Sequence, residues 1–299
     1  MDRLHLMTVF AAVAEAESFA KAARRLGMSA PAVTRAVSAL ERRLGVRLLT
    51  RTTRFVRATE AGLRYLEDAR RIIAEVDEAD QAVGGANAAP RGRLVVTAPV
   101  LFGRIFVAPV LVDYLRRHQD VTVSALFLDR VVHLVEEGVD VAVRIGQLPD
   151  SSLQAIPVGQ VRSVLCAAPG YLEQHGAPAT PADLKAHVLI ASSGISPNPE
   201  WHFAQGARTF GVKVDPRLSV TTNDAAIEAA LQGFGIARLL SYQVAPMLAS
   251  GALRTVLGDY ETGALPIHVI HREGRHAAAK VRSFVDMAVE SLRNDPALR

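Results

Sequence analysis

The stretch from Ser29 to Arg43 carries side chains that can hydrogen-bond to nucleic acid. If it is a helix, Thr34, Arg35 and Ser38 lie on one of its faces, together with Arg42 and Arg43. Hydroxyl and guanidinium groups contact base edges in the DNA major groove and phosphates on the backbone. The chemistry that these residue types predict is recognition of DNA.

Two short helices joined by a tight turn, over residues 19–45, would position this face. The first has apolar residues at helical spacing, namely Phe19, Ala22, Ala23 and Leu26, and Gly27 ends it. The second is capped by Ser29, has Pro31 in its first turn and is expected to bury Val33, Val37, Leu40 and Leu44. This pattern is typical of a helix-turn-helix, although an ordinary helical hairpin with a solvated charged face has the same periodicity.

Flanking segments extend this module on both sides. Leu4–Ala16 is expected to form a helix that packs under the hairpin. Residues 46–59 alternate in polarity and predict two short strands around a turn, a wing whose arginines would meet phosphates: Arg47, Arg51, Arg54 and Arg57. Plain surface charge is the alternative.

The distribution of charge supports a polyanion as the partner of this module. Residues 1–65 contain 12 Lys and Arg against 5 Asp and Glu, whereas the rest of the chain has 22 against 25. The net charge of +4 therefore divides into a module of +7 and a body of −3.

A long helix is expected from Glu60 to about Val83, capped by Thr59. It carries a narrow apolar seam that could pair with a second copy: Leu66, Ala69, Ile73, Val76 and Val83, interrupted by Asp80. A dimer would present two copies of the second helix of the helix-turn-helix to a DNA site with two-fold symmetry. Residues 84–92, GGANAAPRG, read as a linker.

Beyond the linker, strands alternate with helical stretches, which predicts two α/β units with parallel sheets. Strands are expected at 93–99, 121–128, 140–146, 161–168, 188–191, 217–221, 235–240 and 265–271. Helices are expected at 102–118, 129–138, near Tyr171, at 223–232 and at 277–293. Ligands of such sheets bind beyond the carboxyl ends of strands, so the turns at 97–103 and 221–226 are candidate contacts, although structural caps are commoner there.

Other functional classes find little support. The single cysteine, Cys166, lies in an apolar run, which fits a buried side chain in a reducing cytosol. The N-terminus has no signal-peptide pattern and no run is long enough for a membrane span, so a cytoplasmic protein is expected. A solute-binding protein is therefore disfavoured. An enzyme is disfavoured because the histidines, such as His268, His271 and His276, share no helix face with a carboxylate. We expect no catalytic residue, metal or cofactor.

The whole chain resembles the LysR-type transcriptional regulators. The matching pieces are residues 19–62, the segment EEGVDVAVRIGQLPDSSL at 136–153, and TNDAAIEAALQGFGIARLL at 222–240. The second piece is similar to the branch with an Arg-x-Gly-x-Leu-x-Asp-Ser-Ser-Leu segment. The resemblance implies a DNA-binding regulator with a small-molecule effector and no enzymatic activity.

The resemblance also implies a domain plan. A winged helix-turn-helix would occupy 1–58, a dimerising linker helix 59–84 and a hinge 85–92. An α/β effector domain like a periplasmic binding protein would fill 91–299, with lobe one at about 91–161 and 266–299 and lobe two at about 162–265. The partners implied are promoter DNA with an interrupted dyad, a small effector in the cleft, and further copies of the chain, forming a dimer and then a tetramer.

Site residues follow by position. DNA contacts would involve Ser29, Ala30, Pro31, Thr34, Arg35, Ser38, Arg51, Arg54 and Arg57. The effector cleft would involve Pro99, Val100, Leu101, Arg144, Trp201, His202, Thr222 and Asn223. Many members have a longer polar side chain at Ala30, so base reading would depend on Arg35 and DNA shape. The apolar turn at 99–101, where carboxylate-binding members offer hydroxyls, suggests a more apolar ligand.

Overall fold

The computed structural model describes residues 2–51, 55–83, 89–130, 132–148, 153–192, 200–272 and 277–299. For residues 51, 74, 75 and 77–83 it describes the backbone alone. The chain divides into two compact units, Met1–Ala88 and Ala89–Arg299.

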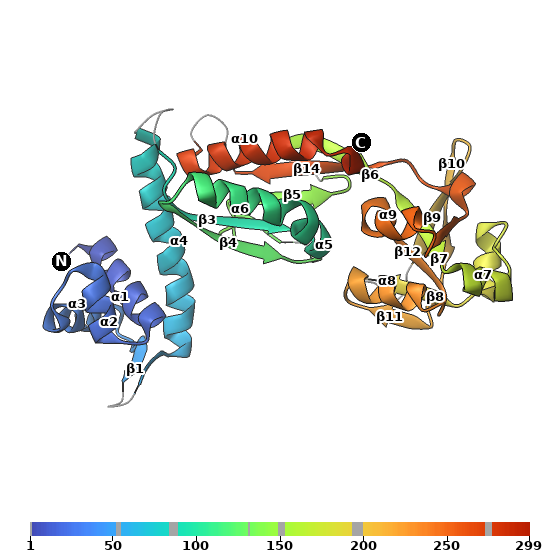
Figure 1. Cartoon of the computed structure of the whole chain (residues 1–299). Coiled ribbons are helices and arrows are strands. Elements are labelled where there is room, and N and C mark those ends of the chain that lie inside the picture. The colour runs from blue at the N-terminus through green and yellow to red at the C-terminus, as the bar shows by residue number, and fades with distance from the viewer. Residues whose placement is uncertain are drawn as a thin grey trace. The chain divides into compact units, whose positions relative to one another are not determined.

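The first unit is helical with a small hairpin (Figure 1). Its elements are α1 (Arg3–Ala16), α2 (Phe19–Leu26), α3 (Ala30–Leu44), β1 (Leu49–Arg51), β2 (Val56–Ala58) and α4 (Glu60–Val83). Each boundary has a local cause. The Ser18 and Ser29 hydroxyls accept from the backbone at the starts of α2 and α3, and Gly27 and Gly45 end these helices with positive φ angles.

The core of this unit forms around α1, which contacts α2, α3 and α4. Phe10 and Val13 of α1 are fully buried, and so is one stripe of α3: Val33, Ala36, Val37 and Leu40. Leu44 was expected to belong to this buried stripe, and that expectation is wrong, because Leu44 is 37% exposed. Leu44 lies directly before Gly45, where the chain leaves the helix, and the next leucines in the chain, Leu48 and Leu49, are buried in the core.

The apolar seam of α4 is used in part within the chain itself. Leu66 and Ala69 are buried in this unit, and the Tyr65 ring lies 5.6 Å from that of Phe10. The Glu15 carboxylate ties α1 to both neighbours, at 2.8 Å from Arg25 of α2 and 3.0 Å from Arg70 of α4. The first turns of α4 are therefore part of the helix-turn-helix core.

The second unit begins with a lobe built on one five-stranded sheet, in the order β4-β3-β5-β14-β6 among the described residues. Its strands are β3 (Gly92–Ala98), β4 (Val121–Phe127), β5 (Val141–Ile145), β6 (Gln154–Val161) and β14 (Leu265–His271). Its helical segments are α5 (Val100–Phe102), the π-helical η1 (Gly103–Val107), α6 (Ala108–Arg117), α10 (Ala279–Asn294) and η4 (Pro296–Leu298). Both α6 and α10 cover one face of the sheet (Figure 1).

The other lobe has its own five-stranded sheet within the described residues, in the order β11-β8-β12-β7-β13. Its strands are β7 (Ser163–Ala167), β8 (Leu189–Ser192), β11 (Leu218–Val220), β12 (Ile236–Leu240) and β13 (Arg254–Val256), and β9 (Glu200–Gln205) pairs with β10 (Arg208–Lys213) as a hairpin. Its helices are α7 (Pro169–His175), η2 (Pro181–Ala186), α8 (Asn223–Leu231), α9 (Ser241–Ala249) and η3 (Gly258–Tyr260).

Purely parallel sheets were a wrong expectation. In lobe one β3 runs parallel to β4 and β5, whereas β14 is antiparallel to both β5 and β6. In lobe two β7 is antiparallel to β12 and β13. The antiparallel strands are those at which the chain passes from one lobe to the other. Four features were not predicted from the sequence: the strands β6 and β13, the β9–β10 hairpin and α9.

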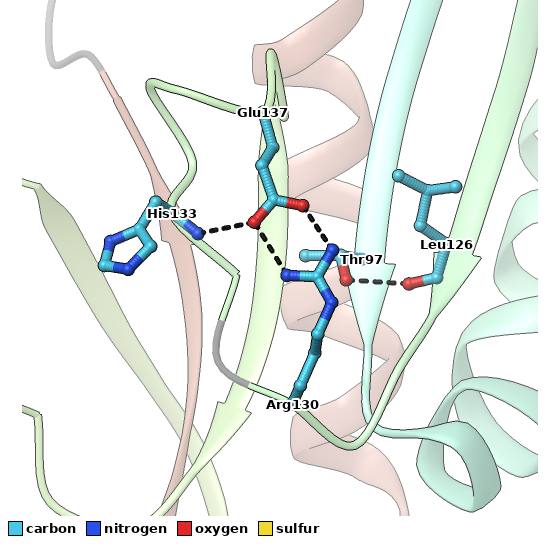
Figure 2. A network of polar contacts seen from close by, with 5 residues as sticks. All are labelled: Thr97, Leu126, Arg130, His133 and Glu137. Carbon is cyan, nitrogen blue, oxygen red and sulfur yellow. Dashed lines mark hydrogen bonds and ion pairs between the residues drawn. The ribbon is translucent and has the colours of Figure 1, made fainter.

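The helix expected at 129–138 is also wrong, since the described part of this stretch consists of bends, irregular backbone and a turn at 134–138. The Asp129 carboxylate, which could cap such a helix, instead accepts from the Val100 backbone N–H at 2.9 Å. The Glu137 carboxylate accepts two hydrogen bonds from Arg130, at 2.9 and 2.6 Å, and one from the His133 backbone (Figure 2). In the neighbouring strands β3 and β4, the Thr97 hydroxyl donates to the Leu126 carbonyl, 2.7 Å away (Figure 2).

None of the helices in the described part of the chain is both long enough and apolar enough to cross a bilayer.

Replacing Leu40 with Ala should destabilise the first unit by about 2 to 5 kcal/mol, because a fully buried side chain leaves a cavity. Leu44→Ala is the matched control and should cost far less, since Leu44 is exposed. Native-state hydrogen exchange of the α1–α3 amides measures both. Equal losses of protection would contradict the packing described.

The turn held by Glu137 should be insensitive to mild acid. Hydrogen bonds from Arg130 lower the pKa of Glu137 from 4.5 to about 2, although the group is exposed. The stabilisation of the turn by this contact is therefore fully present above pH 4.5 and is lost as the pH falls through about 2. The His133 amide shift in NMR spectra, followed during an acid titration, should report this, and Glu137→Gln, but not Glu136→Gln, should abolish the response.

Candidate functional site

The exposed face of α3 is set by burial of the opposite face. Thr34 and Arg35 are exposed and Ser38 is half-buried, while Ser29, Ala30 and Pro31 lie exposed at the start of the helix. The Thr34 hydroxyl donates to the Ala30 carbonyl at 3.0 Å, which leaves its oxygen available as an acceptor. Arg35 has no ion-pair partner among the described residues, so its guanidinium donors are available to a ligand.

The β1–β2 wing is fixed to α3 by one carboxylate. Glu41 accepts from the backbone N–H groups of Leu48 and Leu49, at 3.0 and 3.1 Å. Arg47 and Arg57 are exposed on this wing, and the Arg57 guanidinium lies 5.5 Å from the centre of the Phe55 ring. Arg54 and the side chain of Arg51 lie outside the described residues, so their predicted phosphate contacts stay predictions.

Sequence analysis missed two residues that position the wing, Glu41 and Gly62. The Leu48 carbonyl accepts from the Thr59 backbone at 2.9 Å and lies so close to Gly62 that a Cβ there would be 2.0 Å away. The Thr59 hydroxyl caps α4 by accepting from the Gly62 N–H at 2.9 Å. A Glu within a polar helix face and a Gly in a first helical turn carry no local signal of such contacts.

The arrangement suits nucleic acid because one rigid helix presents hydroxyl and guanidinium groups beside a basic hairpin. Contacts from the wing to phosphates would fix the register, and the side chains of α3 would reach base edges.

A second site is a cavity of about 580 Å³ between the two sheets of the second unit. Residues from lobe one that line it are Pro99, Asp129, Ile145 and Leu265. Those from lobe two are Ser163, Ala191, Ser192, Glu200, Trp201, Asn223, Arg238, Leu239, Leu240, Tyr242 and Gln243. The cavity thus combines an apolar wall with a few polar groups, as small-molecule sites do.

The structure brings three of the predicted cleft residues to this cavity: Pro99, Trp201 and Asn223. The other five do not line it. Leu101 is buried in the core, His202 is exposed, and the Thr222 hydroxyl caps α8 by accepting from Ala225. Val100 donates its N–H to Asp129.

Arg144 lies elsewhere on the sheet. It pairs across strands with His268, whereas its neighbours Val143 and Ile145 belong to the core covered by α6 and α10. One nitrogen of Arg144, Nη2, is buried without a hydrogen-bond partner in the described part of the chain. Burial lowers the pKa of this guanidinium.

The lobes meet beside the cavity at an aromatic cluster. The Tyr242 ring of α9 lies 5.5 Å from that of Phe102 and 5.6 Å from that of Phe106, centre to centre. Burial raises the pKa of Tyr242. An exposed ion pair at 3.6 Å joins Arg104 of η1 to Asp224 of α8.

Arg238 of β12 is the cationic group of the cavity. Its Nε donates to the Ser163 hydroxyl at 2.9 Å and its Nη2 to the His202 carbonyl at 3.4 Å. Burial lowers its pKa, because removal from water disfavours the charged form. Sequence analysis missed it, since a single Arg in an apolar strand has no distinguishing pattern.

Within the described residues, no group of three or more His, Cys, Asp or Glu side chains could hold a metal ion. Cys166 is buried, and burial raises the pKa of its thiol to about 12. A thiol of this kind is a poor nucleophile at neutral pH.

Comparison with known families covers nearly the whole chain. Residues 4–63 match the bacterial regulatory helix-turn-helix proteins of the lysR family, and residues 87–293 match the LysR substrate binding domain.

Relatives and solved structures agree with these matches. An HTH-type transcriptional repressor of Pseudomonas aeruginosa is 34% identical, over 100% of this chain and 95% of that protein. The structure of CrgA, a LysR-type transcriptional regulator from Neisseria meningitidis, is 30% identical with a TM-score of 0.62, covering 97% of this chain and 99% of CrgA. The full-length Vibrio cholerae virulence activator AphB shares the fold, with a TM-score of 0.64 at 24% identity over 97% and 99% of the two chains.

These matches cover both units, and the proteins of this family regulate transcription rather than catalyse reactions. They bind promoter DNA and a small-molecule effector, and they act as oligomers. The chain belongs to the LysR family of transcriptional regulators, with a helix-turn-helix DNA-binding domain and a two-lobed effector-binding domain.

Proposed function

We propose that this regulator reads a promoter site with α3 and that a small molecule in the cavity between the lobes controls it. The observation that carries the proposal is the division of α3 into two faces. Four of its residues are fully buried, while Thr34 and Arg35 project from the opposite face. DNA contacts are assigned to Ser29, Ala30, Pro31, Thr34, Arg35, Ser38, Arg51, Arg54 and Arg57.

Dimerisation through the linker helix is part of the proposal. Leu66 and Ala69 of the predicted seam are buried within the chain, so they do not belong to the pairing surface that we propose. A two-fold dimer would place two copies of α3 on an interrupted dyad, and contacts between effector domains would extend it to a tetramer. We assign 1–58 to the winged helix-turn-helix, 59–84 to the linker helix, 85–92 to the hinge and 91–299 to the effector domain, acting in the cytoplasm.

Control by the effector requires two arrangements of the lobes that bind it with different affinity. The free-energy difference between the two bound states is all that the ligand can transmit to the DNA-binding end. The cavity supports this because its lining comes from both lobes, so a change in lobe spacing would alter the contacts with a ligand.

The direct test is binding of the purified chain to the region upstream of its own gene, at a stated salt concentration, with competitor DNA present. Salt matters because release of counterions contributes much of the affinity. Protection of two half-sites one helical turn or more apart supports the dyad. Binding that any competitor removes would contradict sequence-specific regulation.

Arg35→Ala should weaken binding to the specific site by about 1 to 3 kcal/mol, since a base contact of an arginine has about this value. Binding to unrelated DNA should change much less. The charge-matched control is Arg116→Ala on α6, which should leave both affinities unaltered. Gel-shift titrations on specific and scrambled DNA distinguish these cases, and an equal loss on both would assign Arg35 to the phosphates.

Gly62→Ala should weaken DNA binding although Gly62 carries no side chain. The new Cβ would lie 2.0 Å from the Leu48 carbonyl oxygen, so the wing must move relative to α4. Gly258→Ala is the control, because a Cβ there meets no atom within 4 Å. The same titrations measure the effect, and normal affinity of a folded Gly62→Ala protein would show that wing position is unimportant.

A further inference from the structure

The cavity between the lobes holds two opposite charges, one from each lobe. Asp129 follows β4 of lobe one, and Arg238 lies in β12 of lobe two. Both line the cavity of about 580 Å³. Neither forms an ion pair with any residue that the structure describes, so each charge lacks a partner of opposite sign.

The guanidinium of Arg238 is held but not neutralised. Its two hydrogen bonds to Ser163 and His202 use two of its five N–H donors, and both acceptors are uncharged. Arg238 is half-buried, and a cation that is partly removed from water without an anion is unfavourable. A carboxylate binds a guanidinium through two parallel hydrogen bonds. The geometry of Arg238 therefore suits an acidic group of a ligand.

Asp129 is held in a comparable way in lobe one. One carboxylate oxygen accepts from the Val100 N–H at 2.9 Å, and the carboxylate is half-buried beside the apolar Pro99. It would repel a second anion and attract a hydrogen-bond donor or a cation. The Asp129 carboxylate therefore contacts the turn at residues 99–101, whose apolar side chains had suggested an apolar ligand.

The remaining acid of the lining, Glu200, does not serve as the partner of Arg238. It is exposed, and its side chain lies across the hairpin over Gly211, where a Cβ would be 2.3 Å from the Glu200 Oε1. The walls between Arg238 and Asp129 include apolar side chains, among them Pro99, Trp201 and Leu265.

We propose that the effector is a small amphoteric molecule whose acidic group binds Arg238 and whose amine or other donor group faces Asp129. This inference rests on the proposed function, in which the cavity is the effector site. A ligand with both groups touches both lobes, and so it can favour one lobe arrangement. A simple acid would leave Asp129 facing an anion, and a simple amine would leave Arg238 unpaired.

The test is thermal unfolding of the full chain with two sets of probes, the twenty free amino acids and the three aminobenzoates. For every probe that raises the unfolding temperature, the deaminated acid and the decarboxylated amine of the same skeleton are titrated by calorimetry. We expect at least one amphoteric probe to stabilise the chain. Its matched acid and amine should each bind about tenfold or more weakly, since each lacks one charge-assisted contact.

Variants assign the two contacts. Arg238→Gln and Asp129→Asn should each weaken binding of that probe by about ten- to a hundredfold. Asn retains an oxygen that can accept from Val100, and the unfolding temperature without ligand shows whether each variant is folded. Two exposed residues serve as charge-matched controls, Arg254→Gln in lobe two and Asp113→Asn in lobe one, and both should bind normally.

Three results would overturn the inference: no stabilisation by any amphoteric probe at millimolar concentration, equal affinity for the matched acid, or unchanged binding by folded Arg238→Gln. Promoter binding measured on the same preparations separates this inference from the proposed function. If DNA binding is sequence-specific while the probes fail, the amphoteric ligand alone is wrong. If the chain binds no specific DNA, the proposed function fails whatever the probes show.

Discussion

The insertion of β14 between β5 and β6 is the constraint on which the effector domain depends. The chain completes β6, builds the whole of the second sheet, and then returns to place β14 antiparallel to both neighbours. Two connections therefore join the lobes, and the aromatic contact of Tyr242 with Phe102 and Phe106 is a further contact between them. A cavity between two sheets that share a core can change shape without either sheet unfolding, which is what a ligand-controlled switch requires.

The DNA-binding module depends on a different constraint, the complete burial of one stripe of α3 against α1. Because this stripe is buried, Thr34 and Arg35, which lie on the opposite face of the helix, are exposed to solvent. The wing follows because Glu41, on the same helix, holds the first backbone N–H groups of the hairpin. Glu41 thus joins α3 to the hairpin, and the burial of Leu66 makes the start of α4 part of the same core.

Charge is arranged differently at the two sites. In the first unit an excess of arginine lies on exposed surface, where it acts on a polyanion over a Debye length and is screened by salt. In the cavity single charges are partly removed from water, so each has a large effect on which small molecule fits. Arg238 and Asp129 belong to different lobes, so a ligand that contacted both would bind with an affinity that depends on the relative position of the lobes.

The sequence by itself determined the helix-turn-helix, the hairpin that follows it and the long helix α4, because these depend on periodicity, caps and turn residues within about forty positions. The family followed from the resemblance of three segments, at residues 19–62, 136–153 and 222–240. It also located most strands of the effector domain and three of the cavity residues, Pro99, Trp201 and Asn223. It misplaced Leu44, predicted a helix at 129–138 and missed Arg238, Glu41 and Gly62. Only the tertiary structure decided these. Leu44 is left exposed whereas Leu48 and Leu49 are buried in the core. The two cavity residues depend on partners far away in the chain, since Asp129 accepts from Val100 and Arg238 donates to Ser163.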